Sequence, residues 1–282
     1  MIFLNGMISI RKHIRWRLAI GLFLANVCFP AFLKAQAIPE AKEKFNSSEL
    51  WLGFYTKYRI KERLYYYGEY HLRRKEFANK MGQVYLRFGL SHIVNKNFEI
   101  TGGIVTPFYW STNPNQPNTD KVVPQFRFWQ QFLFITPFDR LKVYHQIRLE
   151  QRWRRDFVEE SPFELSYRFR YKILGYYPLN NHKLVNKTLF LSMYEEIFIQ
   201  AGKPVVFDHM EDNRMFLGLG YILNENMQFQ LGYQWSFRHS GSPFRYENRH
   251  MLRLSFYHSF DFYQKRNLSR QPVSAIDPFG HH

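Results

Sequence analysis

Residues 227–238 read MQFQLGYQWSFR, and this stretch decides the fold of the chain. Its odd-numbered positions carry Met, Phe, Leu, Tyr, Trp and Phe, whereas its even-numbered positions carry Gln, Gln, Gly, Gln, Ser and Arg. Successive side chains of a β-strand point to opposite faces of the sheet, so this alternation predicts a strand with one apolar and one polar face.

The same period of two recurs along most of the 282 residues. No segment shows the period of 3.6 that an amphipathic helix requires. The sequence therefore predicts an all-β protein of eleven strands, most of them longer than the roughly 5–6 residues usual in soluble sheets. The other ten segments are 50–58, 64–73, 83–91, 98–106, 125–135, 141–154, 165–176, 188–199, 214–223 and 251–260.

The composition of the two faces separates a soluble β-protein from a membrane barrel. Phe, Tyr and Trp make up 19% of the chain and crowd the apolar faces, so two sheets of large rings would have to share one core in a soluble protein. Apolar side chains outside and polar side chains inside are typical of a transmembrane barrel, whose tilted strands need about 9–11 residues. We therefore expect an all-β fold, namely a closed antiparallel transmembrane β-barrel of about 10–12 strands with a polar, basic lumen.

The N-terminus has the features of a secretory signal peptide. A basic stretch at 11–17 precedes an apolar run at 18–32 and the small-x-small sequence Ala35-Gln36-Ala37. This pattern predicts a signal peptide over 1–35, export through the Sec pathway and cleavage near Ala35 or Ala37. An exported chain with lipid-facing strands is expected in the outer membrane of a Gram-negative envelope. The single cysteine, Cys28, lies in this segment, which leaves the mature chain without thiol chemistry.

Three further regions follow the predicted signal peptide: a polar N-terminal lead over 36–48, the barrel over 49–262 and a C-terminal tail over 263–282. Short and long links alternate between the predicted strands, as they do in outer-membrane barrels. Bacterial barrels usually have an even number of strands. Either a further strand lies between 40 and 48, for twelve in all, or one segment does not pair, for ten. We favour twelve.

Charged residues at inward positions predict a network in the lumen. Buried charges are costly unless they are paired, so the first interpretation is a set of salt bridges that fills the barrel and fixes its register. A basic constriction that selects small anionic solutes is the second, and a lipid or glycan site at the mouth is the third. Glu150 is expected to bridge Arg168 or Arg170 on the next strand. The predicted network comprises Glu69, Arg73, Arg87, Arg127, Arg148, Glu150, Arg152, Arg168, Arg170, Glu196 and Arg214.

The sequence offers little for catalysis or for cofactor binding. His258 and Ser259 are adjacent in a strand and face opposite sides, so one cannot activate the other. No phosphate-loop or dinucleotide motif is present, and we expect no enzyme, metal or cofactor. Arg168 and Arg170 face away from the neighbouring rings, which removes the stacking surface that nucleic acid needs. One predicted loop contains possible cation ligands, for which a solvated loop is the preferred interpretation: Asp208, His209, Glu211 and Asp212.

Several short motifs recur in the order of a known family. They are Glu49-Leu50-Trp51-Leu52-Gly53, Leu149-Glu150-Gln151-Arg152-Trp153, Arg168-Phe169-Arg170-Tyr171, Tyr194-Glu195-Glu196-Ile197-Phe198, Asn213-Arg214 and Leu217-Gly218-Leu219-Gly220-Tyr221. From Leu50 to Phe262 the chain resembles the uncharacterised outer-membrane β-barrel family named domain of unknown function 2490. The resemblance implies a Gram-negative outer-membrane barrel and no particular activity or ligand. The family tends to stop at its last strand, so either Phe262 or Phe279 provides the terminal aromatic read in barrel assembly.

These observations predict a non-catalytic outer-membrane barrel, either a small porin-like pore or a structural or binding protein of the envelope. Its expected partners are outer-membrane lipid and small anionic solutes, with no nucleic acid, and its oligomeric state stays open. The first alternative is an outer-membrane enzyme that acts on lipid or lipopolysaccharide. The second is a soluble periplasmic β protein.

Overall fold

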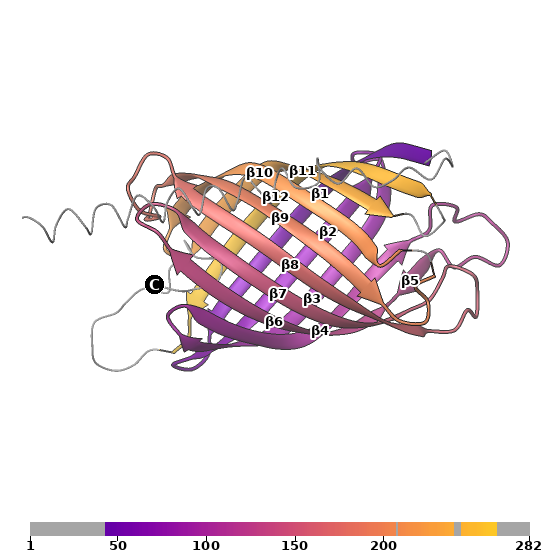
Figure 1. Cartoon of the computed structure of the whole chain (residues 1–282), viewed down its shortest axis with the longest axis horizontal. Coiled ribbons are helices and arrows are strands. Elements are labelled where there is room, and N and C mark those ends of the chain that lie inside the picture. The colour runs from indigo at the N-terminus through magenta and orange to yellow at the C-terminus, as the bar shows by residue number, and fades with distance from the viewer. Residues whose placement is uncertain (1–42, 207, 240–243, 264–282) are drawn as a thin grey trace, which may run out of the picture. The chain divides into compact units, whose positions relative to one another are not determined.

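A computed structural model describes residues 43–206, 208–239 and 244–263 (Figure 1). The predicted signal peptide and its cleavage site lie outside the described residues, as does the tail from residue 264 onward. The described residues form no helix able to cross a membrane. They form the strands β1 Glu43–Arg59, β2 Leu64–Lys75, β3 Lys80–Asn95, β4 Phe98–Trp110, β5 Val122–Pro124, β6 Phe126–Pro137, β7 Lys142–Arg154, β8 Glu164–Pro178, β9 Leu189–Ala201, β10 Met210–Asn224, β11 Met227–His239 and β12 Arg245–Asp261.

Eleven of these strands close into a barrel, and the short β5 pairs only with β4 (Figure 1). Neighbouring strands are antiparallel except at one seam, where β1 and β12 are parallel from Glu43 opposite Arg245 to Arg59 opposite Asp261. The parallel seam follows from the odd number of strands in the barrel. When the chain reverses at each connection, the first and eleventh strands run in the same direction and close only as a parallel pair.

The predicted strands and the orientation of their faces are confirmed, but the total number of barrel strands differs from the one that we favoured. Each of the eleven predicted segments coincides with one barrel strand, and three of them begin one residue before it, at 125, 141 and 188. Residues 43–48, where a separate twelfth strand was expected, instead extend β1 and pair with β12. The barrel therefore has eleven strands and not the twelve that we favoured. The polar residues expected to form a separate strand are instead the first part of β1.

The apolar face of the barrel points outward, as predicted. Leu90, Leu217 and Leu231 are 53%, 57% and 52% exposed, whereas the inward Gln228 and Gln234 are fully buried. The alternation of the sequence therefore produces an apolar outer surface around a polar interior.

Two facing glycines make room for a ring inside the barrel. Gly89 on β3 lies opposite Gly103 on β4, and the Trp129 ring of β6 covers this flat patch. A Cβ atom at Gly89 would lie 2.7 Å from that ring, and one at Gly103 would lie 2.0 Å from the Phe88 carbonyl oxygen. The absence of a side chain at Gly89 thus leaves room for Trp129, and its absence at Gly103 allows the close approach of β4 to β3.

The connections divide the barrel into two ends. We call the end with the β4–β6, β7–β8, β9–β10 and β11–β12 connections the long-loop end, and the opposite end the turn end. The predicted alternation of link lengths holds only in part. The β2–β3 link at the long-loop end has just four residues, 76–79, and the β8–β9 link at the turn end has ten, 179–188.

Candidate functional site

Glu150 on β7 is the centre of the charge network inside the barrel. Its side chain is fully buried, and it contacts four arginines from three other strands. Arg168 Nη2 and Arg170 Nη1 of β8 lie 2.5 and 2.8 Å from its carboxylate oxygens. Arg87 Nη2 of β3 and Arg127 Nη1 of β6 lie at 3.1 and 3.5 Å. One carboxylate therefore ties β7 to its neighbours β6 and β8 and to the non-neighbouring strand β3.

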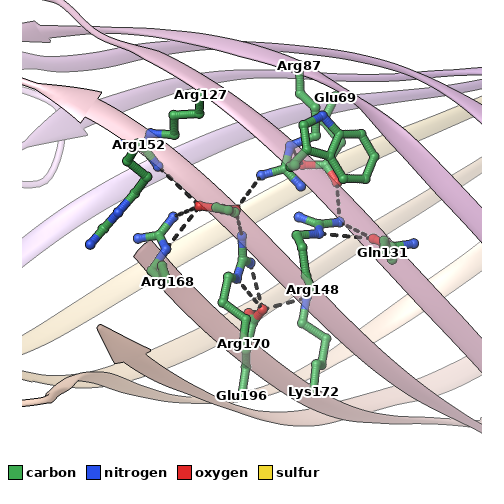
Figure 2. A network of polar contacts seen from close by, with 12 residues as sticks. Glu69, Arg87, Arg127, Gln131, Arg148, Arg152, Arg168, Arg170, Lys172 and Glu196 are labelled. Atoms are coloured by element: carbon green, nitrogen blue, oxygen red, sulfur yellow. Dashed lines mark hydrogen bonds and ion pairs between the residues drawn. The ribbon is translucent and has the colours of Figure 1, made fainter. Parts of the chain in front are cut away.

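Two further carboxylates extend this network, as Figure 2 shows. Glu69 Oε1 accepts a hydrogen bond from Arg148 Nη2 at 3.1 Å, and Glu69 Oε2 lies 3.5 Å from Arg87 Nε. Glu196 Oε1 accepts from Arg170 Nη2 at 2.6 Å. Arg87 and Arg170 each contact two carboxylates, so they connect the three acids into one continuous set.

The structure gives the other predicted network residues different partners. Arg152 Nη1 contacts Glu211 at 2.8 Å, and Arg214 Nη2 contacts Asp212 at 2.7 Å. Arg73 is the exception. Its guanidinium stacks on the Trp51 ring at 3.8 Å and donates to the Gln83 side chain at 2.8 Å, but no carboxylate of the described residues lies within salt-bridge distance of it.

Sequence reasoning missed two acids of the network because it placed them in a loop. Glu211 and Asp212 lie in β10, where a β-bulge shifts the register between Met210 and Asp212. A bulge inserts an extra residue into a strand and redirects its side chains. Both acids therefore line the lumen although they are adjacent in sequence. The described residues contain no group of three or more possible metal ligands.

The network surrounds a cavity of about 700 Å³. Its lining contains fourteen Arg and Lys side chains against six Asp and Glu side chains. Arg155, Asp156, Ser161 and Pro204 from the long-loop end belong to it, whereas no residue of the fully described turns at the turn end does. The cavity is thus strongly basic and is reached from the long-loop end.

Packed side chains form a floor between the cavity and the turn end. Its buried apolar residues come from five consecutive strands, β6 to β10, and Leu184 of the β8–β9 link packs against them. Leu174, Tyr176 and Tyr194 also belong to the cavity lining, so they mark its lower limit. The floor residues are Leu133, Ile135, Tyr144, Leu174, Tyr176, Phe190, Tyr194, Phe216 and Ile222.

Two long loops are fastened to each other beside the opening. Arg155 Nη2 contacts Asp120 at 2.6 Å. The backbone N–H of Asp120 donates to the Phe157 carbonyl at 2.8 Å, and that of Glu159 donates to the Asn118 carbonyl at 3.0 Å. These contacts hold the β4–β6 and β7–β8 connections together as one wall of the opening.

The histidine and serine considered for catalysis do not meet. His258 Nδ1 lies 3.2 Å from the Tyr58 hydroxyl, while the Ser259 hydroxyl donates to the Glu225 carbonyl at 3.3 Å.

The fold and cavity define a closed β-barrel protein with a basic interior. The chain belongs to the family described as protein of unknown function (DUF2490), whose model matches residues 48–259, and the predicted family is therefore confirmed. No curated protein matches the chain. Among solved structures it is similar to one titled "NanC porin structure in rhombohedral crystal form", at 10% identity and a TM-score of 0.41. That match covers 71% of this chain and 94% of the other.

Proposed function

We propose that this protein is a non-catalytic outer-membrane barrel that binds small anionic solutes in its cavity. The apolar outer surface supports the membrane location, because extended apolar patches on the outside of a protein mark membrane or protein contacts. Closure of the sheet supports it as well, since every strand edge of the barrel is paired and a bilayer tolerates no open edge. The predicted signal peptide supplies the route of export.

The single observation that carries the binding function is the charge of the cavity. Fourteen cationic side chains against six anionic ones leave a large positive excess in a space with limited access to water. Electrostatic attraction between such a lining and an anion is stronger than in bulk water, because the local dielectric constant is lower. An anionic solute entering from the long-loop end is thus the occupant that the lining favours.

The floor favours a binding cavity over a small pore. Conduction requires a continuous aqueous path, whereas buried side chains pack inside the turn end, among them Tyr144, Tyr176 and Phe190 of the consecutive strands β7, β8 and β9. The Tyr144 and Tyr176 rings are 5.7 Å apart, and the Tyr176 and Phe190 rings are 5.4 Å apart, both in edge-to-face contact. Solutes therefore enter and leave by the same opening.

Planar bilayer recordings test this function. The wild-type protein is expected to give no conductance steps, and the double variant Tyr144→Ala/Tyr176→Ala is expected to give anion-preferring steps because it removes part of the floor. The matched control is Phe128→Ala/Phe134→Ala, which removes two exposed outward rings and should stay silent. Steady anion conductance of the wild type would instead establish an open pore.

The membrane location has its own test. In cell fractionation, the protein is expected in the outer membrane, and its band on a denaturing gel should shift on boiling because a closed barrel resists detergent. A soluble periplasmic protein whose band does not shift would contradict the membrane assignment.

A further inference from the structure

The cations of the cavity lining fall into two groups. Ten of the fourteen have a carboxylate of the described residues within 4.0 Å. The remaining four have none among the residues that the structure describes: Arg73, Arg154, Arg238 and Arg253. Both terminal nitrogens of Arg253 are paired with tyrosine hydroxyls, since Nη1 donates to Tyr194 at 2.5 Å and Nη2 donates to Tyr55. Arg73, Arg154 and Arg238 therefore have neither a carboxylate within 4.0 Å nor a hydrogen bond to a tyrosine hydroxyl among the described residues.

These three arginines lie at the opening of the cavity. Arg73 is two residues from the end of β2, Arg154 is the last residue of β7, and Arg238 is one residue from the end of β11. All three strands run toward the long-loop end. Among the described residues, the structure shows neither a hydrogen bond nor an ion pair made by the side chain of Arg154 or Arg238. We call these three residues the mouth arginines.

The mouth arginines are spaced around the whole ring of strands. Following the strand order, β7 is four strands from β2, β11 is four strands from β7, and β2 is three strands from β11. Eleven strands about 4.8 Å apart and tilted by about 40° give a barrel radius of roughly 11 Å. Side chains that reach inward from such a wall surround a space at its centre, which one small ion would not fill.

The surroundings of Arg73 keep its guanidinium ready for a ligand. Its flat face stacks on Trp51 at 3.8 Å, and Nη1 donates to Gln83. Nε is buried without a partner. A stacked guanidinium keeps the donors along its edge in one plane, and this planar fork matches phosphate oxygens in a bidentate arrangement. The ring thus orients Arg73 without neutralising its charge.

We infer that the mouth arginines form a recognition site for a ligand with two or more phosphate groups. This inference rests on the proposed binding function and names the class of ligand. A phosphate group carries up to two negative charges and three acceptor oxygens, so it neutralises a cation surplus better than a carboxylate does. Two or more such groups on one molecule reach guanidiniums on different sides of the opening. The phosphates belong either to a soluble molecule or to a phosphorylated lipid headgroup.

Calorimetric titration of the detergent-purified protein tests the site, with tripolyphosphate, inorganic phosphate and citrate as probes. Tripolyphosphate is expected to bind at least tenfold more tightly than either of the others. The variant Arg73→Gln/Arg154→Gln/Arg238→Gln should weaken tripolyphosphate binding at least tenfold. The control Arg63→Gln/Lys96→Gln/Lys183→Gln removes the same charge from exposed positions at the turn end and should leave binding unchanged.

The outcomes separate this inference from the proposed function. If tripolyphosphate binds the wild type and the mouth variant equally, the mouth site is wrong while the binding cavity stands. If citrate binds as tightly as tripolyphosphate, the phosphate assignment is wrong. If none of the three anions binds the folded protein, the proposed function fails as well.

The source of the phosphate groups is identified by repeating the titration in nanodiscs. Discs of zwitterionic lipid are compared with discs that also contain lipopolysaccharide, whose headgroup is phosphorylated. Competition by lipopolysaccharide that depends on the mouth arginines supports the site with a lipid headgroup as its ligand. Equal tripolyphosphate binding in both kinds of disc supports the site with a soluble ligand.

Discussion

Arg168 on β8 donates two hydrogen bonds to one carboxylate oxygen of Glu150 on β7, from Nε at 3.0 Å and from Nη2 at 2.5 Å. The two residues are direct neighbours across the sheet. The other carboxylate oxygen of Glu150 forms ion pairs with Arg87 and Arg170. A single buried anion is thus shared among arginines that would repel one another without it.

Replacing Glu150 is therefore expected to destabilise the barrel. Removing one partner of a buried ion pair typically costs about 3–5 kcal/mol, and Glu150→Gln leaves four guanidiniums around a neutral amide. We expect the free energy of unfolding in detergent to fall by that amount, which is measured as a lower urea midpoint. The control Glu225→Gln changes an exposed turn residue. Equal midpoints for wild type and Glu150→Gln would show that the network does not stabilise the fold.

The facing glycines give a second prediction. Gly103→Ala should destabilise the barrel by about 1–3 kcal/mol or prevent folding, because an added Cβ would overlap the backbone of β3. Its neighbour Gly102 provides the control, since a Cβ there meets nothing closer than 3.8 Å. Refolding yield and urea midpoint measure both variants. Similar values for Gly102→Ala and Gly103→Ala would contradict the close approach of β3 and β4.

The bulge in β10 predicts coupling between Arg152 and Glu211, which lie 2.8 Å apart. In a double-mutant cycle of Arg152→Met and Glu211→Gln, contacting residues should show a coupling free energy of about 0.5–3 kcal/mol. The cycle of Arg152→Met with Glu225→Gln should show none, because Glu225 lies in a turn at the opposite end. Additive effects in the first cycle would place Glu211 outside the lumen.

Brominated lipids distinguish the two faces of the barrel. Trp235 lies on the outward face and Trp129 on the inward face. In vesicles of brominated lipid, a variant that retains only Trp235 should lose most of its fluorescence, because bromine quenches at contact. A variant that retains only Trp129 should lose little. Quenching of neither tryptophan would contradict insertion in the bilayer, and stronger quenching of Trp129 would reverse the faces.

Most of the fold was predictable from alternation alone. The period of two predicted the eleven strands and their faces, because a strand that separates apolar from polar surroundings must alternate. The odd number was not predictable. Residues 43–48 are polar except for Phe45 and lack an alternating apolar face, so nothing in their pattern indicates that they continue β1 along β12.

The site was predictable only where alternation is regular. The alternation of apolar and polar positions predicts that Glu150 points inward and lies opposite Arg168, and the register of β7 and β8 agrees. The alternation does not hold at Glu211 and Asp212, because a β-bulge directs these two adjacent side chains into the lumen. The mouth arginines include Arg73 from the predicted set, but Arg154 and Arg238 were not singled out. Which cations lack a partner depends on the three-dimensional arrangement of all the others.

The parallel seam between β1 and β12 has a consequence for how the barrel forms. Every other joint of the barrel unites strands that follow one another in the chain, whereas the seam joins Glu43 to Arg245. Contacts between residues so distant in sequence carry a large loop-closure entropy and form slowly. Until the last strand is in place, the molecule is an open sheet with two unpaired edges, which are sites for aggregation. The barrel is thus most prone to aggregation just before β1 pairs with β12. A chain truncated before β12 cannot form this pairing and keeps its two open edges.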